Sequence, residues 1–517
     1  KCLLKYSDGV VIVSGKEPRE QYRLGEGPAL EVVEKLPTPE EVFKVPKLSG
    51  WKLFATIFGP SFTALGGALG SGEWLMGPTV AVSYGMKLFW FIWVGCFFQT
   101  IYNIAFCRMT MLIGEPALVY FARVFPRKFW IAWNVAVLFF ALAWPGWALG
   151  AATALGSIVL GRVPGVGVPA EQAAADAVLV RYLGIGLFLF TFFVVMFGGK
   201  IYNTLEYIFR FKVLFVTFTV FILAIIYGKP EIWAGALEGY ASVGYIPPGA
   251  DIFLLGGWWG YTGWLSAINF LMSNWYRDKG YGMGSLVGYL PAIIGGKKIE
   301  VSPVGKIFKF TPENLVTWKR WEKLLVWDQW LIFFPFGVVG MSMPAILVAS
   351  FIPVGTKLPE WGIAAHVATQ FGAMWGPVGY YFISFIGLVV LWGTQLQIMD
   401  TLTRNMTDLL WSTSEGVRKW AKGDARRIYY PFMACYITFA MWAIWQAAPL
   451  IILLLSANIA NFGGYAVFLL YWLERKLPKE LRLRWYYWIF LVAYAVLCWF
   501  FFVAVFILGR LLGIRVF

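Results

Sequence analysis

Apolar side chains occur along this chain in long runs, and polar side chains gather between the runs. Runs of about 20 residues without a charge recur along the chain, and this is the length that a bilayer-spanning helix requires. A run such as Trp485 to Leu508 is apolar on every face, whereas the strands of a membrane barrel alternate in polarity. The pattern therefore predicts an all-α polytopic membrane protein with about eleven transmembrane helices. The predicted spans, numbered 1 to 11, are residues 54–82, 87–113, 129–160, 181–199, 205–227, 252–276, 325–352, 376–403, 428–446, 448–473 and 485–509.

The positions of the charges predict how the chain lies in the membrane. The chain has 517 residues, is 59% hydrophobic and carries a net charge of +15. When the N-terminus is placed inside and the spans alternate, roughly 36 of the 43 Lys and Arg residues fall on one side. Cytoplasmic loops are typically basic in this way. We expect a multi-pass plasma-membrane protein with a cytoplasmic N-terminus and an outer C-terminus, whose partner is the lipid bilayer and not nucleic acid.

Two polar stretches interrupt this pattern. Residues 1–50 predict a cytoplasmic N-terminal segment ahead of a transmembrane domain at 51–517, with a short strand near residues 10–13 and a helix starting near Pro39. The second stretch, a cytoplasmic loop insertion at 277–323, contains alternating residues that suggest a hairpin. Because both stretches have strand-like character, we expect that they pair with each other.

An internal match is the most informative feature of the sequence. Residues 66–74 in span 1 and residues 256–264 in span 6 both fit the pattern G-G-x-x-G-x-x-x-W. They open the two halves of a five-plus-five arrangement, and paired glycine-interrupted helices at matching positions indicate an inverted repeat with a binding site at the breaks. The alternative is that the glycines only let helices pack closely.

The break in span 1 carries an acid. The stretch Gly70, Ser71, Gly72 and Glu73 places a carboxylate near the middle of an apolar run. Inserting a charged carboxylate at that depth costs at least ~2.5 kcal/mol unless it is paired or protonated, so such acids are usually functional. The alternative is that Glu73 forms a salt bridge with a purely structural role.

Other polar residues of the spans could converge on the same point. The candidates for substrate or ion binding are Gly260, Tyr261, Thr262, Ser266 and Asn269 in span 6, Gln395 and Asp400 in span 8, and Asn458 in span 10. This set is rich in oxygen and free of thiol and imidazole groups, which suits a hard cation such as Mg²⁺. We expect Glu73 and Asp400 to be the charged metal ligands. Each Thr or Asn taken alone is more often a hydrogen-bonding contact between helices.

Motifs of enzymes are missing from the sequence. It contains no nucleophile elbow, phosphate-cradling loop or zinc-type spacing. We therefore expect neither an enzyme nor a bound cofactor. Transport would then draw its energy from an ion gradient or from the gradient of the substrate itself, and a divalent cation would be the cargo.

Two stretches resemble the Nramp (natural resistance-associated macrophage protein) divalent-metal transporters. They run from Gly59 through Trp74, and from Tyr84 to the end of span 2 at residues 108–114. The resemblance extends weakly over roughly residues 50–475. It implies eleven or twelve helices in the inverted-repeat fold of amino-acid and organocation transporters, with helices 1 and 6 broken.

The chain departs from that family at its metal site. The family's Asp-Pro-Gly-Asn signature falls on residues 70–73, so its Asp is missing and Glu73 takes the Asn position. The family's Met-Pro-His falls on Ser266, Ala267 and Ile268, which removes the thioether that favours manganese and iron over Mg²⁺. Span 3 also lacks the acids that relay protons in the family. These departures resemble the Nramp-related magnesium transporters.

Three functions remain open from the sequence. The first is a secondary transporter that moves a hard divalent cation, such as magnesium, by alternating access. The second is an organic-solute symporter of the same fold, in which the amide-bearing start of the second half of span 1 holds a substrate carboxylate. The third is a membrane scaffold or receptor that transports nothing.

Overall fold

Helices make up most of the structure, a computed structural model that describes residues 5–7, 10–12, 20–45, 58–70, 72–197, 200–294, 296, 301–356, 362–446 and 449–511. Each of the eleven predicted spans falls on one helix or on consecutive helices. Eight helices in the described residues are long and apolar enough to cross a membrane. The polytopic all-helical fold is therefore confirmed. Spans 1 and 6 are interrupted, so neither contains a single long helix.

The first five spans form one half of the bundle. Span 1 is divided, span 3 bends between Leu142 and Gly146, and spans 2, 4 and 5 are continuous helices. The helices of these five spans are α3 (Pro60–Ala68), η1 (Gly72–Met76), α4 (Gly77–Tyr84), α5 (Trp90–Ile113), α7 (Arg127–Leu142), α8 (Gly146–Leu160), α9 (Ala170–Met196) and α10 (Ile201–Tyr227). Short helices connect them at η2 (Met86–Leu88), α6 (Ala117–Phe121) and α11 (Pro230–Ala241).

The second five spans follow the same plan, with a divided first span. Their helices are α12 (Ile252–Tyr261), η3 (Ser266–Met272), α13 (Ser273–Lys279), α14 (Pro312–Asp328), η5 (Gln329–Phe333), α15 (Phe334–Phe351), α17 (Pro377–Thr413), α19 (Arg426–Ala443), α20 (Pro449–Ala460), η6 (Asn461–Tyr465) and α21 (Ala466–Glu474). Connecting helices are η4 (Gly282–Leu286), α16 (Gly362–Trp375), α18 (Glu415–Trp420) and η7 (Lys479–Leu481). Span 11 consists of α22 (Trp485–Phe502) and η8 (Val503–Leu511).

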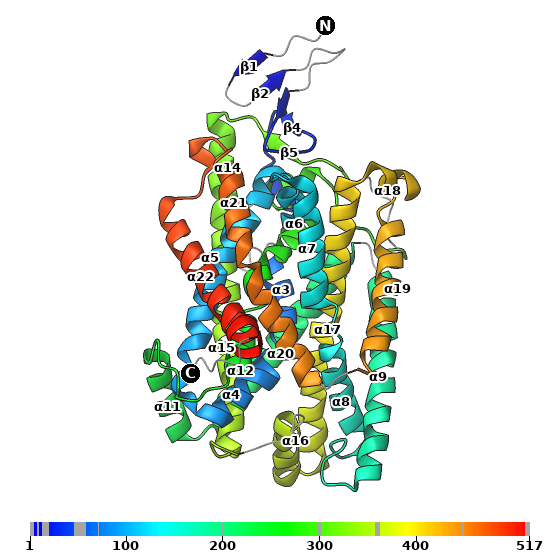
Figure 1. Ribbon diagram of the computed structural model, residues 1–517, viewed down its shortest axis with the longest axis vertical. Helices are drawn as coiled ribbons and strands as arrows, with labels where there is room; N and C mark the ends of the chain where they lie inside the picture. Colours follow the sequence, from blue (N-terminus) through cyan, green and yellow to red (C-terminus); the bar gives the residue numbers. More distant parts are fainter. Residues whose placement is uncertain are drawn as a thin grey trace.

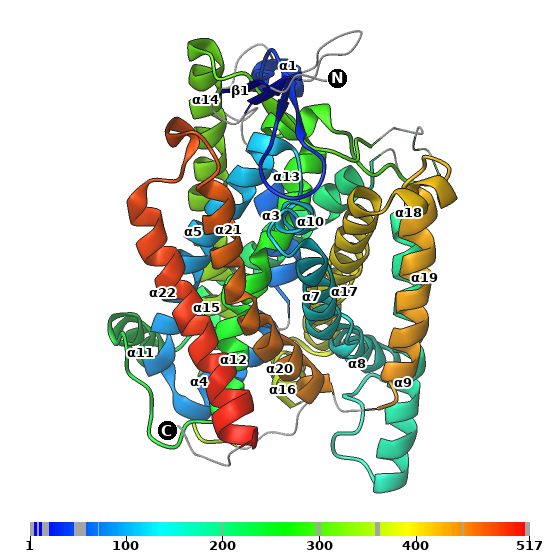
Figure 2. The ribbon, with the colours of Figure 1, turned by 45° about the horizontal axis from the view of Figure 1, so that its top comes forward.

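The divided helices lie inside the bundle. Figure 1 shows α3 and α12 at the centre, while α9 and α19 run side by side at one edge and α22 lies at the other. The turned view keeps α9 and α19 together, and it places α14 and the first strands at the same end of the molecule (Figure 2). We call this end the N-terminal face. Helices α11 and α16 lie at the opposite end (Figure 1).

The N-terminal segment joins the loop insertion in one sheet. The strands are β1 (Lys5–Ser7), β2 (Val10–Ile12), β3 (Glu20–Tyr22), β4 (Leu30–Val33) and β5 (Lys306–Phe308). The first four pair antiparallel in chain order, and β4 pairs parallel with β5, with Val32 opposite Ile307. The expected pairing of the two polar stretches is therefore confirmed. The expected hairpin used residues 299–301 as its other side, and residues 299 and 300 lie outside the described residues.

Beyond the sheet, one helix agrees with the sequence expectation and one differs from it. Helix α1 (Pro39–Phe43) begins at the predicted position, capped by Thr38, whose hydroxyl accepts a hydrogen bond from the Glu41 amide. Helix α14 begins at Pro312, inside the stretch expected to be a loop, and continues through η5 into α15. The loop insertion is thus shorter than predicted, because its last part already belongs to the helix of span 7.

Candidate functional site

Span 1 is broken where the sequence predicted. Helix α3 ends at Ala68 and η1 begins at Gly72, so the backbone leaves the helix between them. The glycines also allow close packing on span 8. A Cβ atom on Gly67 would lie 2.0 Å from the Gln397 side-chain oxygen, and one on Gly70 would lie 1.9 Å from the Thr394 hydroxyl oxygen. A larger residue would require the Gln397 side chain to move at Gly67, and Thr394 or the nearby backbone to shift at Gly70.

The acid of the break stands at the start of its second half. Glu73 belongs to the first turn of η1, directly after Gly72. The side chain of Glu73 and the whole of Ser71 lie outside the described part of the chain. Trp74 follows in the same turn, and its ring nitrogen is buried with no hydrogen-bond partner among the described residues.

Span 6 is broken between Tyr261 and Ser266, and side chains satisfy its freed amides. The Trp264 amide donates to the Gln99 side-chain oxygen of α5 at 2.9 Å, and the Leu265 amide donates to the Asn269 side-chain oxygen at 2.7 Å. The Thr262 hydroxyl donates to the Trp259 carbonyl at 2.7 Å. Asn269 and Thr262 therefore stabilise the break itself.

A lysine that the sequence analysis missed lies at the break of span 1. The buried ammonium of Lys212, from α10, donates to the Gly66 carbonyl at 2.5 Å and to the Val390 carbonyl of α17 at 2.6 Å. The Thr394 hydroxyl donates to the Gly67 carbonyl at 2.8 Å. The Lys212 ammonium thus places a positive charge of the protein itself beside the break. Lys212 is the last of three charged residues in span 5, after Glu206 and Arg210, and its depth in the apolar run was the available signal.

The predicted metal ligand Asp400 is already paired with a cation of the protein. Its carboxylate accepts two hydrogen bonds from Arg404, at 2.9 and 2.8 Å, and one from the Tyr429 hydroxyl at 2.6 Å. Arg404 also binds Asp278, which in turn pairs with Arg277. All four charged groups are buried. A metal ion at Asp400 would have to displace Arg404, so we do not carry Asp400 into the proposals below.

The remaining predicted residues make contacts between helices. The Ser266 hydroxyl bonds the Asn461 side-chain oxygen at 2.5 Å, and the Tyr261 hydroxyl donates to the Leu453 carbonyl at 3.1 Å. The Asn458 amide donates to two carbonyls, each at 2.9 Å. Gly260 packs on the backbone of α20, and Gln395 is buried beside Tyr436. The structure thus gathers Gly70 and Lys212 at one break and uses most of the other residues for packing.

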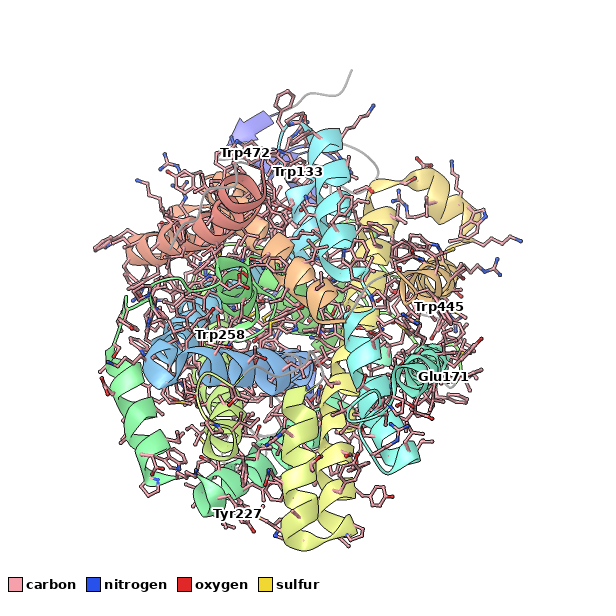
Figure 3. All side chains as sticks on the ribbon, turned by 60° about the horizontal axis from the view of Figure 1, so that its bottom comes forward. Trp133, Glu171, Tyr227, Trp258, Trp445 and Trp472 are labelled. Carbon is pink, nitrogen blue, oxygen red and sulfur yellow. The ribbon has the colours of Figure 1, made fainter. Side chains whose placement is uncertain are left out.

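A cavity adjoins the break on the side away from the N-terminal face. It lies between η1, α8, α16 and α17, and Trp74 forms part of its wall. Its lining is mostly apolar, with hydroxyl groups from Thr153, Ser157 and Ser384. Figure 3 shows the molecule from this side, with Trp258 inside the ring of helices and Glu171 and Tyr227 nearer the rim. Within the described residues, no group of three or more His, Cys, Asp and Glu could hold a metal ion.

Comparison with known proteins identifies the fold but no family. No protein-family model and no curated sequence matches the chain. A solved structure of the Eremococcus coleocola manganese transporter, bound to an aromatic bis-isothiourea substituted compound, matches with a TM-score of 0.57, 16% identity and 92% coverage of each chain. MhsT in complex with L-phenylalanine matches at 0.50, with 14% identity over 87% of this chain and 98% of its own. Mhp1, a nucleobase-cation-symport-1 family transporter, matches at 0.51, with 14% identity over 85% and 90%.

The chain has a transporter fold. The match extends over most of each chain and includes the five-plus-five inverted repeat with broken helices 1 and 6, as the sequence predicted. The chain is therefore a multi-pass membrane protein of a fold that carries small substrates. Identities of 14% to 16% establish this fold alone.

Proposed function

We propose that the chain is a secondary transporter of a hard divalent cation such as Mg²⁺, with Glu73 as the charged ligand at the break of span 1. The observation that carries this proposal is how the other buried acids are used. Eight carboxylates are buried in the described residues, and seven of them form ion pairs with Arg or Lys. The eighth is Asp328, which lies nearer the N-terminal face. Glu73 is the acid that the chain offers at a helix break.

The surroundings of Glu73 support a hard cation. Breaking a helix in the membrane frees carbonyl oxygens that need partners, and such oxygens bind hard cations well. Lys212 and Thr394 already hold the carbonyls of Gly66 and Gly67. The Gly70 carbonyl accepts a hydrogen bond from the Trp74 amide at 2.8 Å, so the protein ligand that the proposal assigns to the cation is the Glu73 carboxylate. With so few protein ligands, the ion would keep part of its water shell, as Mg²⁺ usually does.

An organic solute is the second candidate, favoured by the cavity beside Trp74. Its apolar wall with a few hydroxyl groups is typical of sites for small organic molecules. The neighbouring Lys212 would also repel a divalent cation that came close to it. Among the matching structures, MhsT was solved with L-phenylalanine, while another is a manganese transporter. The same fold thus accommodates both kinds of cargo.

Uptake into proteoliposomes distinguishes the two candidates. The vesicles are loaded with a Mg²⁺-sensitive dye, Mn²⁺ and Ca²⁺ serve as competitors, and wild type is compared with Glu73→Gln. The matched control is Glu171→Gln, which removes an exposed acid at the start of α9. Saturable Mg²⁺ entry that is lost only in Glu73→Gln supports the proposal.

The opposite outcomes are equally clear. Without flux of any divalent ion from a folded preparation, the cation proposal fails, and a screen of amino acids and other organic solutes follows. Thermal stabilisation by one of these solutes, dependent on Trp74, would then favour the second candidate. If no solute stabilises or crosses, and a stoichiometric partner co-purifies, the chain is a scaffold or receptor.

A further inference from the structure

Asp328 differs from every other buried acid in the described part of the chain. It is the last residue of α14, and none of its surface is exposed. No Lys, Arg or His of the described residues lies within salt-bridge distance of its carboxylate. One oxygen, Oδ2, accepts three hydrogen bonds, whereas Oδ1 is buried with no partner. A buried charge with one unsatisfied oxygen is costly, and binding a proton removes that charge.

The three hydrogen bonds attach Asp328 to the two broken spans. Ser61, in the first turn of α3, donates through its amide at 3.2 Å and through its hydroxyl at 2.8 Å. Tyr276 of α13 donates through its hydroxyl at 2.5 Å. The positive end of the α3 dipole also points at this carboxylate, which favours its charged form. Deprotonated Asp328 therefore holds the short helix α3 against span 7.

A chain of polar side chains connects Asp328 with the break of span 6. The Gln329 amide donates to the Ser61 hydroxyl at 3.0 Å and to the Tyr276 hydroxyl at 2.9 Å. The Gln329 oxygen accepts from Asn103 of α5 at 2.9 Å. One helical turn along α5, the Gln99 oxygen accepts from Asn269 at 2.6 Å and from the Trp264 amide of the break.

The two halves of this polar chain face each other on α5. The Gln99 amide nitrogen and the Asn103 oxygen are both buried without a partner. They belong to residues four apart on one helix, which are neighbours on its surface. A donor and an acceptor at this spacing can share one water molecule. Polar side chains thus reach from the span 6 break to Asp328 with one gap, between Gln99 and Asn103, which a water molecule would bridge.

A cavity and a charged pair lie between Asp328 and the N-terminal face. Lys279 lines a cavity of about 470 Å³ there, and its ammonium bonds both oxygens of Glu206 at 2.7 Å. Since Lys279 is neutralised by Glu206, it does not serve as the partner of Asp328. The titratable groups that face Asp328 are Cys107 of α5, Tyr202 and Glu206 of α10, Tyr276 and Lys279 of α13, and Tyr281 after α13.

We propose that Asp328 is a proton-binding latch that holds α3 when it is charged and releases it when it is protonated. The step forms one O–H bond on the carboxylate, with a proton taken from the water of the N-terminal face, and breaks no covalent bond of the protein. Its charge changes from −1 to 0, so the Ser61 hydrogen bonds and the dipole interaction weaken together. Since α3 is one half of broken span 1, its release couples proton binding to the opening of the transport site. This coupling, but not the latch itself, rests on the proposed transport function.

Hydrogen–deuterium exchange of residues 58–70 tests the latch without any transported substrate. The full chain in lipid nanodiscs is compared at several pH values, after correction for the intrinsic pH dependence of exchange. In the wild type, exchange of α3 should rise by roughly 10-fold or more on acidification, the effect of weakening hydrogen bonds to a charged group. Asp328→Asn, which mimics the protonated acid, should exchange fast at every pH.

Two further variants make the test specific. Asp176→Asn removes another buried carboxylate, which pairs with Arg162 at the far end of α8, and it should keep the wild-type pH response. Ser61→Ala keeps the carboxylate but removes one donor, so its exchange should be intermediate at high pH. If the wild type shows no pH response, or Asp328→Asn retains one, the latch is overturned. This measurement needs no flux. The latch can therefore be supported when the uptake experiment fails, and it can be overturned when the uptake experiment succeeds.

Discussion

Lys212 carries a charge into the centre of the bundle and uses it to bind backbone. Its ammonium joins the Gly66 carbonyl of span 1 to the Val390 carbonyl of span 8. Replacing it by methionine keeps the length of the side chain but leaves both buried carbonyls without this donor. We expect Lys212→Met to lower the free energy of unfolding by about 2 kcal/mol, a typical value for losing charged hydrogen bonds.

The measurement for Lys212 is thermal unfolding of the purified protein in detergent. Lys128→Met, which alters an exposed lysine at the start of α7, is the matched control and should leave the midpoint unchanged. Equal midpoints for the wild type and Lys212→Met would show that the bond to the break contributes no stability.

At the same scale, the sequence revealed the glycines and Glu73 but not the charges that surround them. Gly70 was predictable because a break needs residues without side chains. The partners of Lys212 and Asp328 were not, because they lie between 52 and 267 residues away in the chain. The ion pair of Asp400, in contrast, could have been predicted from the sequence. Its partner Arg404 follows four residues later, a spacing that places both on one helical face.

Among the elements, spans 1 and 8 are packed too closely for any side chain larger than glycine. A methyl group at Gly70 would lie 1.9 Å from the Thr394 hydroxyl oxygen, so one helix must shift away from the other. We expect Gly70→Ala to lower the uptake rate of the transported substrate by at least about tenfold, because a small displacement of a site lowers its rate steeply. Gly186→Ala in α9 is the control, because a methyl group there meets nothing within 4 Å.

The outcome for Gly70→Ala is measured as initial uptake rate at equal amounts of reconstituted protein. Gly186→Ala should match or slightly exceed the stability of the wild type, since alanine favours a helix more than glycine does. Unchanged uptake in Gly70→Ala would mean that the contact with Thr394 does not position the break.

The N-terminal segment is a second element whose attachment can be tested. Asn314 of α14 accepts a hydrogen bond from the Leu36 amide at 3.0 Å and donates to the Glu34 and Lys309 carbonyls at 2.8 Å. Two of these bonds join residues 34–36 to the start of α14, and the third joins Lys309 to it. We expect Asn314→Ala to detach this segment and to speed its cleavage by a protease several-fold, as local unfolding exposes the backbone.

Limited proteolysis followed by gel analysis records this cleavage. Thr317→Ala is the control, because within the described part of the chain the Thr317 hydroxyl bonds the Glu313 carbonyl of its own helix. Cleavage at the wild-type rate in Asn314→Ala would show that the other contacts, among them the β4–β5 pairing and the bond from Trp321 to the Pro37 carbonyl, hold the segment.

For the whole molecule, charged groups from several spans converge on one short helix. Helix α3 is bound at its first turn by Asp328 of span 7, at the preceding Phe58 carbonyl by Arg210 of span 5, and near its end by Lys212 of span 5. Helix α4, in the second half of span 1, lies on the other side of the break from α3 (Figure 1). This arrangement makes α3 the part of the broken span whose position depends on charge, which is what a coupled transporter requires of a moving element.

Such a role needs α3 to face the compartment that supplies the proton, so the orientation of the whole molecule is the remaining prediction. The basic loops predict that the N-terminal face is cytoplasmic. Glu415 of α18 is exposed at this face, and Glu231 of α11 is exposed at the other (Figure 1). In a cysteine-free background, an impermeant maleimide added to intact cells should label Glu231→Cys and leave Glu415→Cys unlabelled until the membrane is opened. If only Glu415→Cys were labelled, the N-terminal face would lie outside the cell. Asp328 would then take its proton from outside.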